Sequence, residues 1–205
     1  MTRRSLRFLA IGTMVALVVV LGLVRGISSD NNQASAATMA APHSTSALFY
    51  VTLYGFVDNS PPSAIISNPV IHQKAGGTGT FSDPVTFATD KREEKPGTIV
   101  YYSFLQKYFI MEDTCTECTA DFNGPPGNGD NPTPVRAGHL WRIDLWAGGD
   151  KRSLKNPDKS ALLNCEDNLT QDNGGQVTLN PPNNLPVDTT PIYNVNTRQC
   201  MTPHT

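Results

Sequence analysis

Glycine and proline divide the chain beyond residue 46 into short apolar runs, and this spacing limits what it can fold into. The sequence has 16 Gly and 16 Pro among 205 residues. Short β-branched and aromatic runs bounded by turn-forming residues are typical of strands. We predict strands at 48–54, 84–90, 99–102, 108–113, 139–146 and 176–179. Since no long helical pattern accompanies them, the sequence indicates an all-β fold, either a small barrel or a sandwich.

The first 37 residues have the layout of an export signal. Three arginines within the first seven residues precede an uncharged apolar run over 8–24, and small residues follow it. This order is typical of a secretory signal peptide, although the length of the run also fits an uncleaved membrane anchor. The basic segment fits an ordinary or a twin-arginine signal. We expect a signal or anchor over 1–37, a flexible linker over 38–47, and a secreted or cell-surface protein.

Four cysteines, Cys115, Cys118, Cys165 and Cys200, all lie in the part predicted to be exported. An even number of cysteines in an oxidising compartment predicts two disulfides. Zinc is the rival, but the second half-site that Cys115-x-x-Cys118 would need is missing, so we predict no metal. Redox catalysis by this motif is disfavoured because no βαβ pattern surrounds it. Since a bridge across two residues restrains little, we expect each of these two cysteines to pair with a distant one.

The C-terminal part after Gly149 is rich in proline and differs from the strand-rich part before it. It carries one short predicted helix at 160–164, and its prolines are dense over 181–186. We expect a barrel domain over 48–149 and an extension over 150–205 that packs on the barrel and is tethered by disulfides. The formal net charge of -2 gives no attraction toward nucleic acid.

Three predicted strands carry an aspartate in an apolar setting, at Asp90, Asp113 and Asp144. The order of these and neighbouring motifs resembles the three-aspartate type of double-psi β-barrel. The matching segments are Gly79-Thr80, Asp83-Pro84-Val85, Ala88-Thr89-Asp90, 96–101, Glu112-Asp113-Thr114 and Ile143-Asp144-Leu145-Trp146. That family includes lytic transglycosylases of bacterial cell walls, and rare-lipoprotein-A-like proteins and expansins share its barrel. The resemblance implies a six-stranded double-psi β-barrel.

The resemblance also implies that Asp144 is a catalytic acid/base, with Asp113 and Asp90 as the other aspartates of the motif. A lytic transglycosylase can work with one carboxyl group, because the C6 hydroxyl of the sugar attacks and that carboxyl group accepts its proton. Such a group needs a pKa raised toward neutrality, which partial burial could supply. An aspartate in such a barrel can instead cap a loop by accepting backbone N–H bonds.

Aromatic side chains and a histidine near the predicted site are candidates for binding sugar: Trp146, His139 and Tyr54. Trp141 and Trp146 fall on opposite faces of their strand, so at most one can stack on a sugar ring. We expect a monomer that acts on cell-wall polysaccharide without a cofactor, and that touches a membrane only through an uncleaved N-terminus. The alternatives are a non-catalytic expansin-like glycan-binding module and a disulfide-stapled surface protein with a protein partner.

Overall fold

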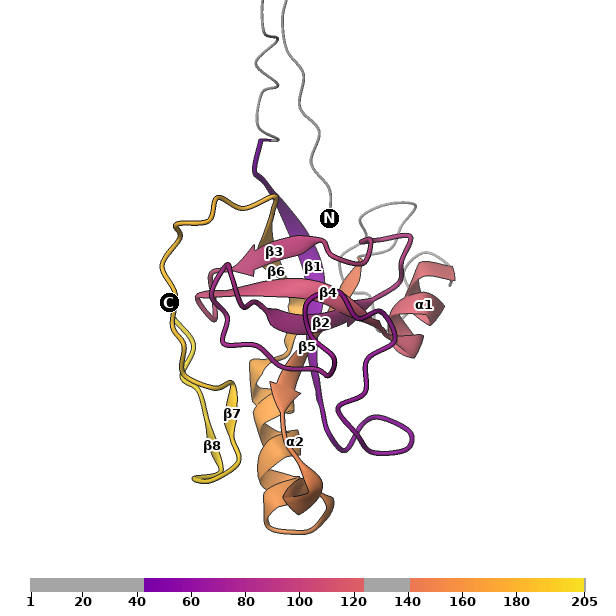
Figure 1. Cartoon of the computed structure of the whole chain (residues 1–205), viewed down its shortest axis with the longest axis vertical. Helices are drawn as coiled ribbons and strands as arrows, with labels where there is room; N and C mark the ends of the chain where they lie inside the picture. Colours follow the sequence, from indigo (N-terminus) through magenta and orange to yellow (C-terminus); the bar gives the residue numbers. More distant parts are fainter. Residues whose placement is uncertain (1–42, 124–140, 205) are drawn as a thin grey trace, which may run out of the picture. The chain divides into compact units, whose positions relative to one another are not determined.

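The computed structural model describes residues 43–123 and 141–204 and contains a closed six-stranded β-barrel (Figure 1). Its strands are β1 (Thr45–Gly55), β2 (Val85–Thr89), β3 (Ile99–Tyr102), β4 (Lys107–Thr114), β5 (Arg142–Gly148) and β6 (Gln171–Leu179). They follow one another around the barrel in the order β1-β5-β2-β4-β3-β6. The pairs β1·β5 and β2·β4 are parallel, and the other neighbours are antiparallel. The predicted all-β barrel is confirmed.

The sixth strand comes from the segment that we predicted to be an extension. Strand β6 pairs with β1 on one side and with β3 on the other, so it closes the barrel. Strand β1 also starts at Thr45, inside the predicted linker. The predicted barrel boundaries of 48 and 149 were therefore too narrow. Polar residues and two glycines in the first half of β6 hide the alternation that marks the other strands.

Apolar side chains fill the barrel through the alternation of its strands. On β1, Phe49, Val51 and Leu53 face the core. On β5, Ile143 and Leu145 are fully buried there. The predicted faces of β5 are thus confirmed, because Arg142, Asp144 and Trp146 lie on the opposite face. The outward face of these two strands is where polar side chains gather.

In the part of the chain that the structure describes, two helices and one 3-10 helix accompany the barrel: α1 (Thr116–Asn123), η2 (Lys151–Leu154) and α2 (Asp158–Leu169). Helix α1 was not predicted, and α2 is longer than the helix predicted at 160–164. In α2, Leu162, Cys165, Glu166 and Leu169 form one buried stripe. No helix within 43–123 or 141–204 is long and apolar enough to cross a membrane. The apolar run at 8–24 lies outside these residues.

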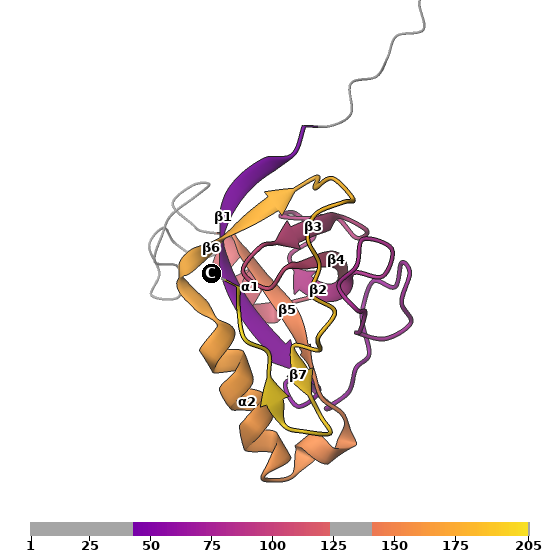
Figure 2. The same ribbon diagram turned by 90° about the vertical axis from the view of Figure 1, so that its left-hand side faces the viewer.

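The C-terminal segment runs along one side of the barrel and ends in the small sheet β7 (Tyr193–Asn194) and β8 (Gln199–Cys200) (Figure 2). Side chains of the barrel hold its carbonyl groups. The hydroxyl of Tyr101 donates to the carbonyl of Pro186, and the hydroxyl of Tyr108 donates to that of Pro182. The Lys107 ammonium donates to the carbonyl of Asp188. The barrel thus supplies hydrogen-bond donors to these carbonyl groups of the proline-rich segment, which has no strand partner there.

The disulfides join Cys115 to Cys118 and Cys165 to Cys200. Our expectation that Cys115 and Cys118 pair with distant cysteines is therefore wrong. Cys118 lies in the first turn of α1, which brings its Cα within 5.1 Å of that of Cys115. The Cys165–Cys200 bridge links α2 to β8, so the predicted tether of the C-terminal segment is present. Both bridges are consistent with folding in an oxidising compartment.

Helix α2 meets the end of β1 through a pair of carboxyl groups. The Asp58 carboxylate accepts the N–H of Gly55 at 2.6 Å, and the carboxyl group of Glu166 faces Asp58. A Cβ atom on Gly55 would lie 2.4 Å from Glu166 Oε1, so only glycine permits this approach. Burial, followed by the charges of Asp58 and Asp144, raises the pKa of Glu166 to about 9. Glu166 is therefore protonated at neutral pH and donates to Asp58.

We expect Glu166→Gln to stabilise the protein above neutral pH. A carboxyl group whose pKa rises from 4.5 to about 9 on folding binds its proton more tightly when folded, so stability falls as pH rises through this window. The amide of glutamine keeps a donor to Asp58 without a proton to lose. At about 1.4 kcal/mol per pH unit above 4.5, the variant should gain up to about 5 kcal/mol at pH 8. Urea unfolding at pH 5 and pH 8 measures the effect.

The exposed neighbour Asp167 supplies the control on the same helix. Asp167→Asn should change the free energy of unfolding by less than about 0.5 kcal/mol at either pH. If Glu166→Gln had the same small effect at both pH values, a protonated Glu166 would be excluded.

Candidate functional site: a carboxyl-lined cleft on the barrel

A cavity of about 600 Å³ opens on the outward face of β1, β5, β2 and β4. Four of the residues that line it carry carboxyl groups: Asp58, Asp113, Glu117 and Asp144. Hydroxyl groups are the other common lining group, from Thr52, Tyr54, Ser60, Thr114 and Thr116. Among the described residues, none that follows Asp144 in the sequence lines the cleft, so the C-terminal segment over 149–204 does not form a wall of it.

The barrel register places Asp113 and Asp144 on either side of Ala88. Ala88 on β2 is the Cα partner of Asp144 on β5 and of Asp113 on β4. Thr52 on β1 extends the same row, as the partner of Asp144. Side chains in one row of a sheet point to the same face, and two interstrand steps separate the Asp113 and Asp144 Cα atoms by about 10 Å. The small side chain of Ala88 leaves the space between the two carboxyl groups open.

A β-bulge in β4 turns Asp113 toward the cleft. Phe87 pairs with Met111 and the next residue, Ala88, pairs with Asp113, so Glu112 is the extra residue. The buried Glu112 carboxylate accepts the backbone N–H groups of 70–72, at 3.2, 2.7 and 2.9 Å. It therefore caps the loop between β1 and β2. This is the loop-capping role that the sequence allowed for an aspartate, taken here by the neighbouring glutamate.

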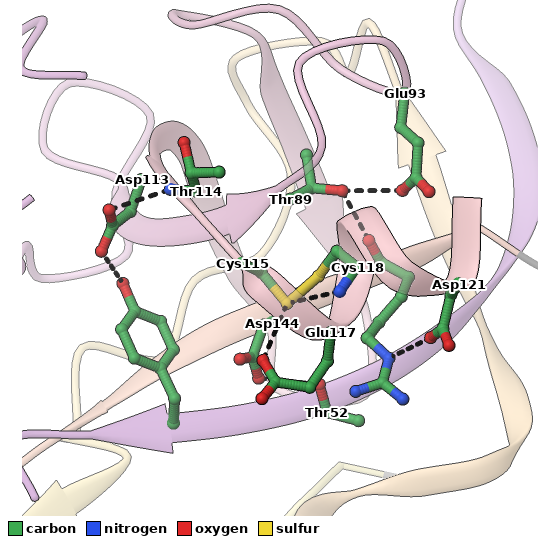
Figure 3. The surroundings of a disulfide bond; sticks show 12 residues. Thr52, Thr89, Glu93, Asp113, Thr114, Cys115, Glu117, Cys118, Asp121 and Asp144 are labelled. Carbon is green, nitrogen blue, oxygen red and sulfur yellow. Dashed lines mark hydrogen bonds and ion pairs between the residues drawn. A yellow bond between two sulfur atoms is a disulfide. The ribbon is translucent and has the colours of Figure 1, made fainter. Parts of the chain in front are cut away.

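Asp113 is held by groups from three parts of the chain. Its Oδ1 accepts the N–H of Ser67 at 3.0 Å and the N–H of Thr114 at 2.8 Å, and its Oδ2 accepts the hydroxyl of Tyr54 at 3.2 Å. The Ser67 hydroxyl is a further donor. These bonds fix the orientation of the Asp113 carboxyl group, so it combines loop capping with a place in the cleft wall (Figure 3).

Asp144 is half-buried and has a different environment from Asp113. Its Oδ1 accepts the hydroxyl of Thr52 at 2.7 Å. Desolvation raises the pKa of Asp144 to about 7, against the opposing effects of the Thr52 hydrogen bond and the Arg142 charge. The charges of Glu117 and Asp58 raise it further. Asp144 can therefore hold a proton or release it near neutral pH, which is the property that acid/base catalysis requires.

Helix α1 and the Cys115–Cys118 disulfide form one wall of the cleft. Glu117 lies between the two cysteines, and its side chain points toward Asp144 (Figure 3). The ion pair between Arg142 and Asp121, at 2.7 Å, fastens α1 to β5. The guanidinium of Arg142 also lies over the ring of Tyr50, 4.5 Å from its centroid. The wall that carries Glu117 is thus tied to the strand that carries Asp144.

The structure brings together three of the predicted site residues, Asp144, Asp113 and Tyr54. Asp90 is not among the cleft residues: Arg92 donates to both of its oxygens and holds its pKa at about 2. Trp146 is buried, packs edge-on against Tyr54 with ring centroids 5.2 Å apart, and lines a second cavity of about 210 Å³. His139 lies outside the described residues. Trp146 and Asp90 thus do not line this cleft.

Sequence reasoning missed Thr52, Asp58 and Glu117. The alternation of β1 puts Thr52 on the same face as Tyr54, so that signal was available. Asp58 stands in a proline-containing loop and Glu117 inside a Cys-x-x-Cys motif, where neither has a periodic pattern. Within the described residues, no group of three or more His, Cys, Asp or Glu side chains could hold a metal ion.

We expect Thr52→Val to raise the pKa of Asp144 above about 7. The Thr52 hydroxyl stabilises the charged carboxylate, and valine has the same shape without a donor. Thr52→Ser keeps the donor and should leave the pKa unchanged. Carboxyl carbon NMR titration measures it. Ser46→Ala, which removes a hydroxyl at the exposed end of β1, is the control. A valine variant with an unchanged or lower pKa would contradict this hydrogen bond.

Comparisons with known proteins relate the barrel and its extension to one family. The family model described as the DDB_G0273701 N-terminal domain matches residues 46–201, which contain all the residues of the cleft and both disulfides. An uncharacterized protein of Dictyostelium discoideum is 34% identical over 151 residues, which are 74% of this chain and 58% of that protein. This chain thus spans just over half the length of that relative. No solved structure matches the chain significantly. The chain belongs to the DDB_G0273701 N-terminal domain family.

Proposed function

We propose that this protein is exported and that its barrel cleaves glycosidic bonds in a peptidoglycan-like cell-wall polysaccharide. The observation that carries the proposal is Asp144, a carboxyl group whose pKa is raised to about 7 in the wall of an open 600 Å³ cleft. A carboxyl group poised between its two protonation states is suited to protonate a leaving oxygen and then to act as a base. The resemblance to double-psi barrels of lytic transglycosylases supports the same substrate class.

In this proposal Asp144 performs both proton transfers. The protonated carboxyl group donates its proton to the glycosidic oxygen as the bond from that oxygen to C1 breaks. The C6 hydroxyl of the same sugar attacks C1, and the Asp144 carboxylate takes the proton of that hydroxyl. The products are an anhydro-sugar end and a free hydroxyl on the leaving sugar. No water is consumed, and Asp144 returns to its protonated form.

Asp113 has a supporting role on the other side of Ala88. Its hydrogen bonds to Ser67, Thr114 and Tyr54 fix it as an acceptor on the cleft wall, where it can hold a sugar hydroxyl. The separation of about 10 Å between the Asp113 and Asp144 Cα atoms leaves room for a sugar between them. Inverting glycosidases also use two carboxyl groups that flank the bond, so hydrolysis by water is the competing reaction in the same cleft.

Export is supported by the arrangement of the N-terminal sequence and by the disulfides. The basic segment, the apolar run at 8–24 and the small residues after it have the order of a signal. Both disulfides suit an oxidising compartment. A wall polysaccharide is a substrate that an exported protein meets.

A glycan-binding module without catalysis is the second candidate. In its favour, the C-terminal segment does not line the cleft, so a glycan chain could lie across it. Against it, the predicted stacking residue Trp146 is 6% exposed and packs on Tyr54 instead of facing the cleft. Binding by aromatic stacking therefore lacks its main side chain among the described residues.

We expect Asp144→Asn to lower the release of soluble anhydro-muropeptides from purified peptidoglycan by at least about a hundredfold. The neutral amide copies the protonated acid in shape but cannot transfer the proton. In the parent protein the rate should fall as pH rises above about 7, because the acid form of Asp144 is then lost. Mass spectrometry of the released fragments, between pH 5 and pH 9, gives both results.

Asp172→Asn is the matched control, because Asp172 is an exposed aspartate on β6 outside the cleft. It should release fragments at the parental rate. Equal release by the parent and Asp144→Asn would exclude Asp144 as the acid. Release of reducing ends in place of anhydro ends would assign hydrolysis to the cleft. Cosedimentation with peptidoglycan, without release by any variant, would assign the binding function.

A further inference from the structure

The Cys115–Cys118 disulfide occupies an unusual place for a bridge that only stabilises a fold. Cys115 follows the end of β4 directly and lines the cleft with 4% of its surface exposed, whereas Cys118 is fully buried. Figure 3 shows the bridge beside Asp144 and Glu117. Cys115 is therefore next to a cavity of about 600 Å³ that is large enough for a small thiol, and Cys118 is shielded behind it.

The first turn of α1 surrounds Cys115 with groups that stabilise a sulfur anion. Helix α1 begins at Thr116, and the N–H of Cys118 donates to Cys115 Sγ at 3.0 Å. The first N–H groups of a helix have no partner within the helix, and its positive dipole end lies there. These groups favour the thiolate of Cys115, whereas the Glu117 carboxylate, with Oε2 3.9 Å from Cys115 Sγ, opposes it. These groups surround Cys115 although no βαβ unit contains the Cys-x-x-Cys motif.

The two disulfides differ in what their opening would release. Cys165–Cys200 spans 35 residues and links α2 to the C-terminal sheet, so its reduction would untie the segment that crosses the barrel. Cys115–Cys118 spans 3 residues and lies within one helical turn. A loop this short contributes little to stability. The ion pair between Asp121 and Arg142, which does not involve either cysteine, also ties α1 to β5. The shorter bridge can therefore open and close in the folded protein.

We propose that Cys115 and Cys118 form a thiol–disulfide exchange site, which small neutral or cationic thiols reach through the cleft. In the reductive direction a thiolate attacks Cys115 Sγ and forms a mixed disulfide, the bond to Cys118 breaks, and the Cys118 thiolate takes a proton from water. A second thiolate, or the second sulfur of a dithiol, displaces Cys115 and leaves as the oxidised disulfide. The pair gains two electrons from the two thiolates, and each cysteine takes one proton from the solvent, which received these protons when the thiols ionised. A disulfide of the same class reverses the steps.

The charge of the cleft selects among thiols. Asp58, Asp113 and Glu117 line the approach, and Glu117 Oε2 lies 3.9 Å from Cys115 Sγ. Carboxylates repel an anionic thiol such as glutathione and attract a cationic one such as cysteamine. At equal thiolate concentration, cysteamine should react about tenfold faster, and the difference should shrink near 1 M salt, where the screening length is about 3 Å. The variant Glu117→Gln should narrow it as well.

The test uses the full chain, equilibrated with graded ratios of reduced and oxidised dithiothreitol. Free thiols are then alkylated and each cysteine peptide is quantified by mass spectrometry. The expected result is that Cys115 and Cys118 become labelled at ratios that leave Cys165–Cys200 closed and the circular dichroism spectrum unchanged. Opening of Cys165–Cys200 first, or opening of both bridges only together with unfolding, would overturn the proposal.

Variants that lack one cysteine of the pair test which sulfur is attacked first, independently of the equilibrium. Cys118→Ser leaves Cys115 free and should form a mixed disulfide with cystamine, detected as a mass increase that dithiothreitol reverses. Cys115→Ser leaves only the buried Cys118 and should react at least about tenfold more slowly. Equal rates for the two variants would show that the cleft gives no preferred access to Cys115. Neither measurement depends on glycan cleavage.

Discussion

Two adjacent carboxyl groups in the bulge of β4 organise the loops and the cleft together. Glu112 accepts the N–H groups of 70–72 and Asp113 accepts those of Ser67 and Thr114, so the long connection from β1 to β2 is fixed to one point of the barrel. Because a bulge puts both residues on the outer face, the same point also presents Asp113 to the cleft. A regular strand would send one of the two into the core, where a carboxyl group without donors is costly.

The acidic character of the cleft has physical consequences beyond any single residue. Burial raises the pKa of Asp58, Asp144 and Glu166, and the charge of Asp58 raises the pKa of Asp144 and Glu166 further. The protein accommodates this by keeping a proton on Glu166, while Arg142 and the Thr52 hydroxyl oppose the rise at Asp144. The buried carboxyl groups of this region therefore underlie three properties: proton uptake, the proposed glycan chemistry and the proposed selectivity for cationic thiols.

Much of the barrel could be predicted from the sequence, because its strands alternate or are bounded by glycine and proline. The two faces of β5 could be predicted from the alternation of residues 141–146 alone. For β6 the prediction covered only residues 176–179, because the polar residues and two glycines in its first half show no alternation. The predicted helix at 160–164 was shorter than α2. The buried stripe of Leu162, Cys165 and Leu169 also contains Glu166, which did not look like a core residue, because its burial depends on a bound proton and on the space beside Gly55. Of the predicted site, Asp144, Asp113 and Tyr54 belong to the cleft, whereas Trp146 and Asp90 do not.

The sequence by itself determined the all-β class, the run of short strands and the outward direction of Asp144, since these depend on local composition and on the two-residue period of a strand. Only the tertiary structure decided the pairing of the cysteines, the contribution of β6 to the barrel and the meeting of Asp113 with Asp144 across Ala88. These features depend on which distant segments become neighbours and on one extra residue in β4. Neither register nor a bulge leaves a periodic mark in the chain, so both emerge only when the barrel closes.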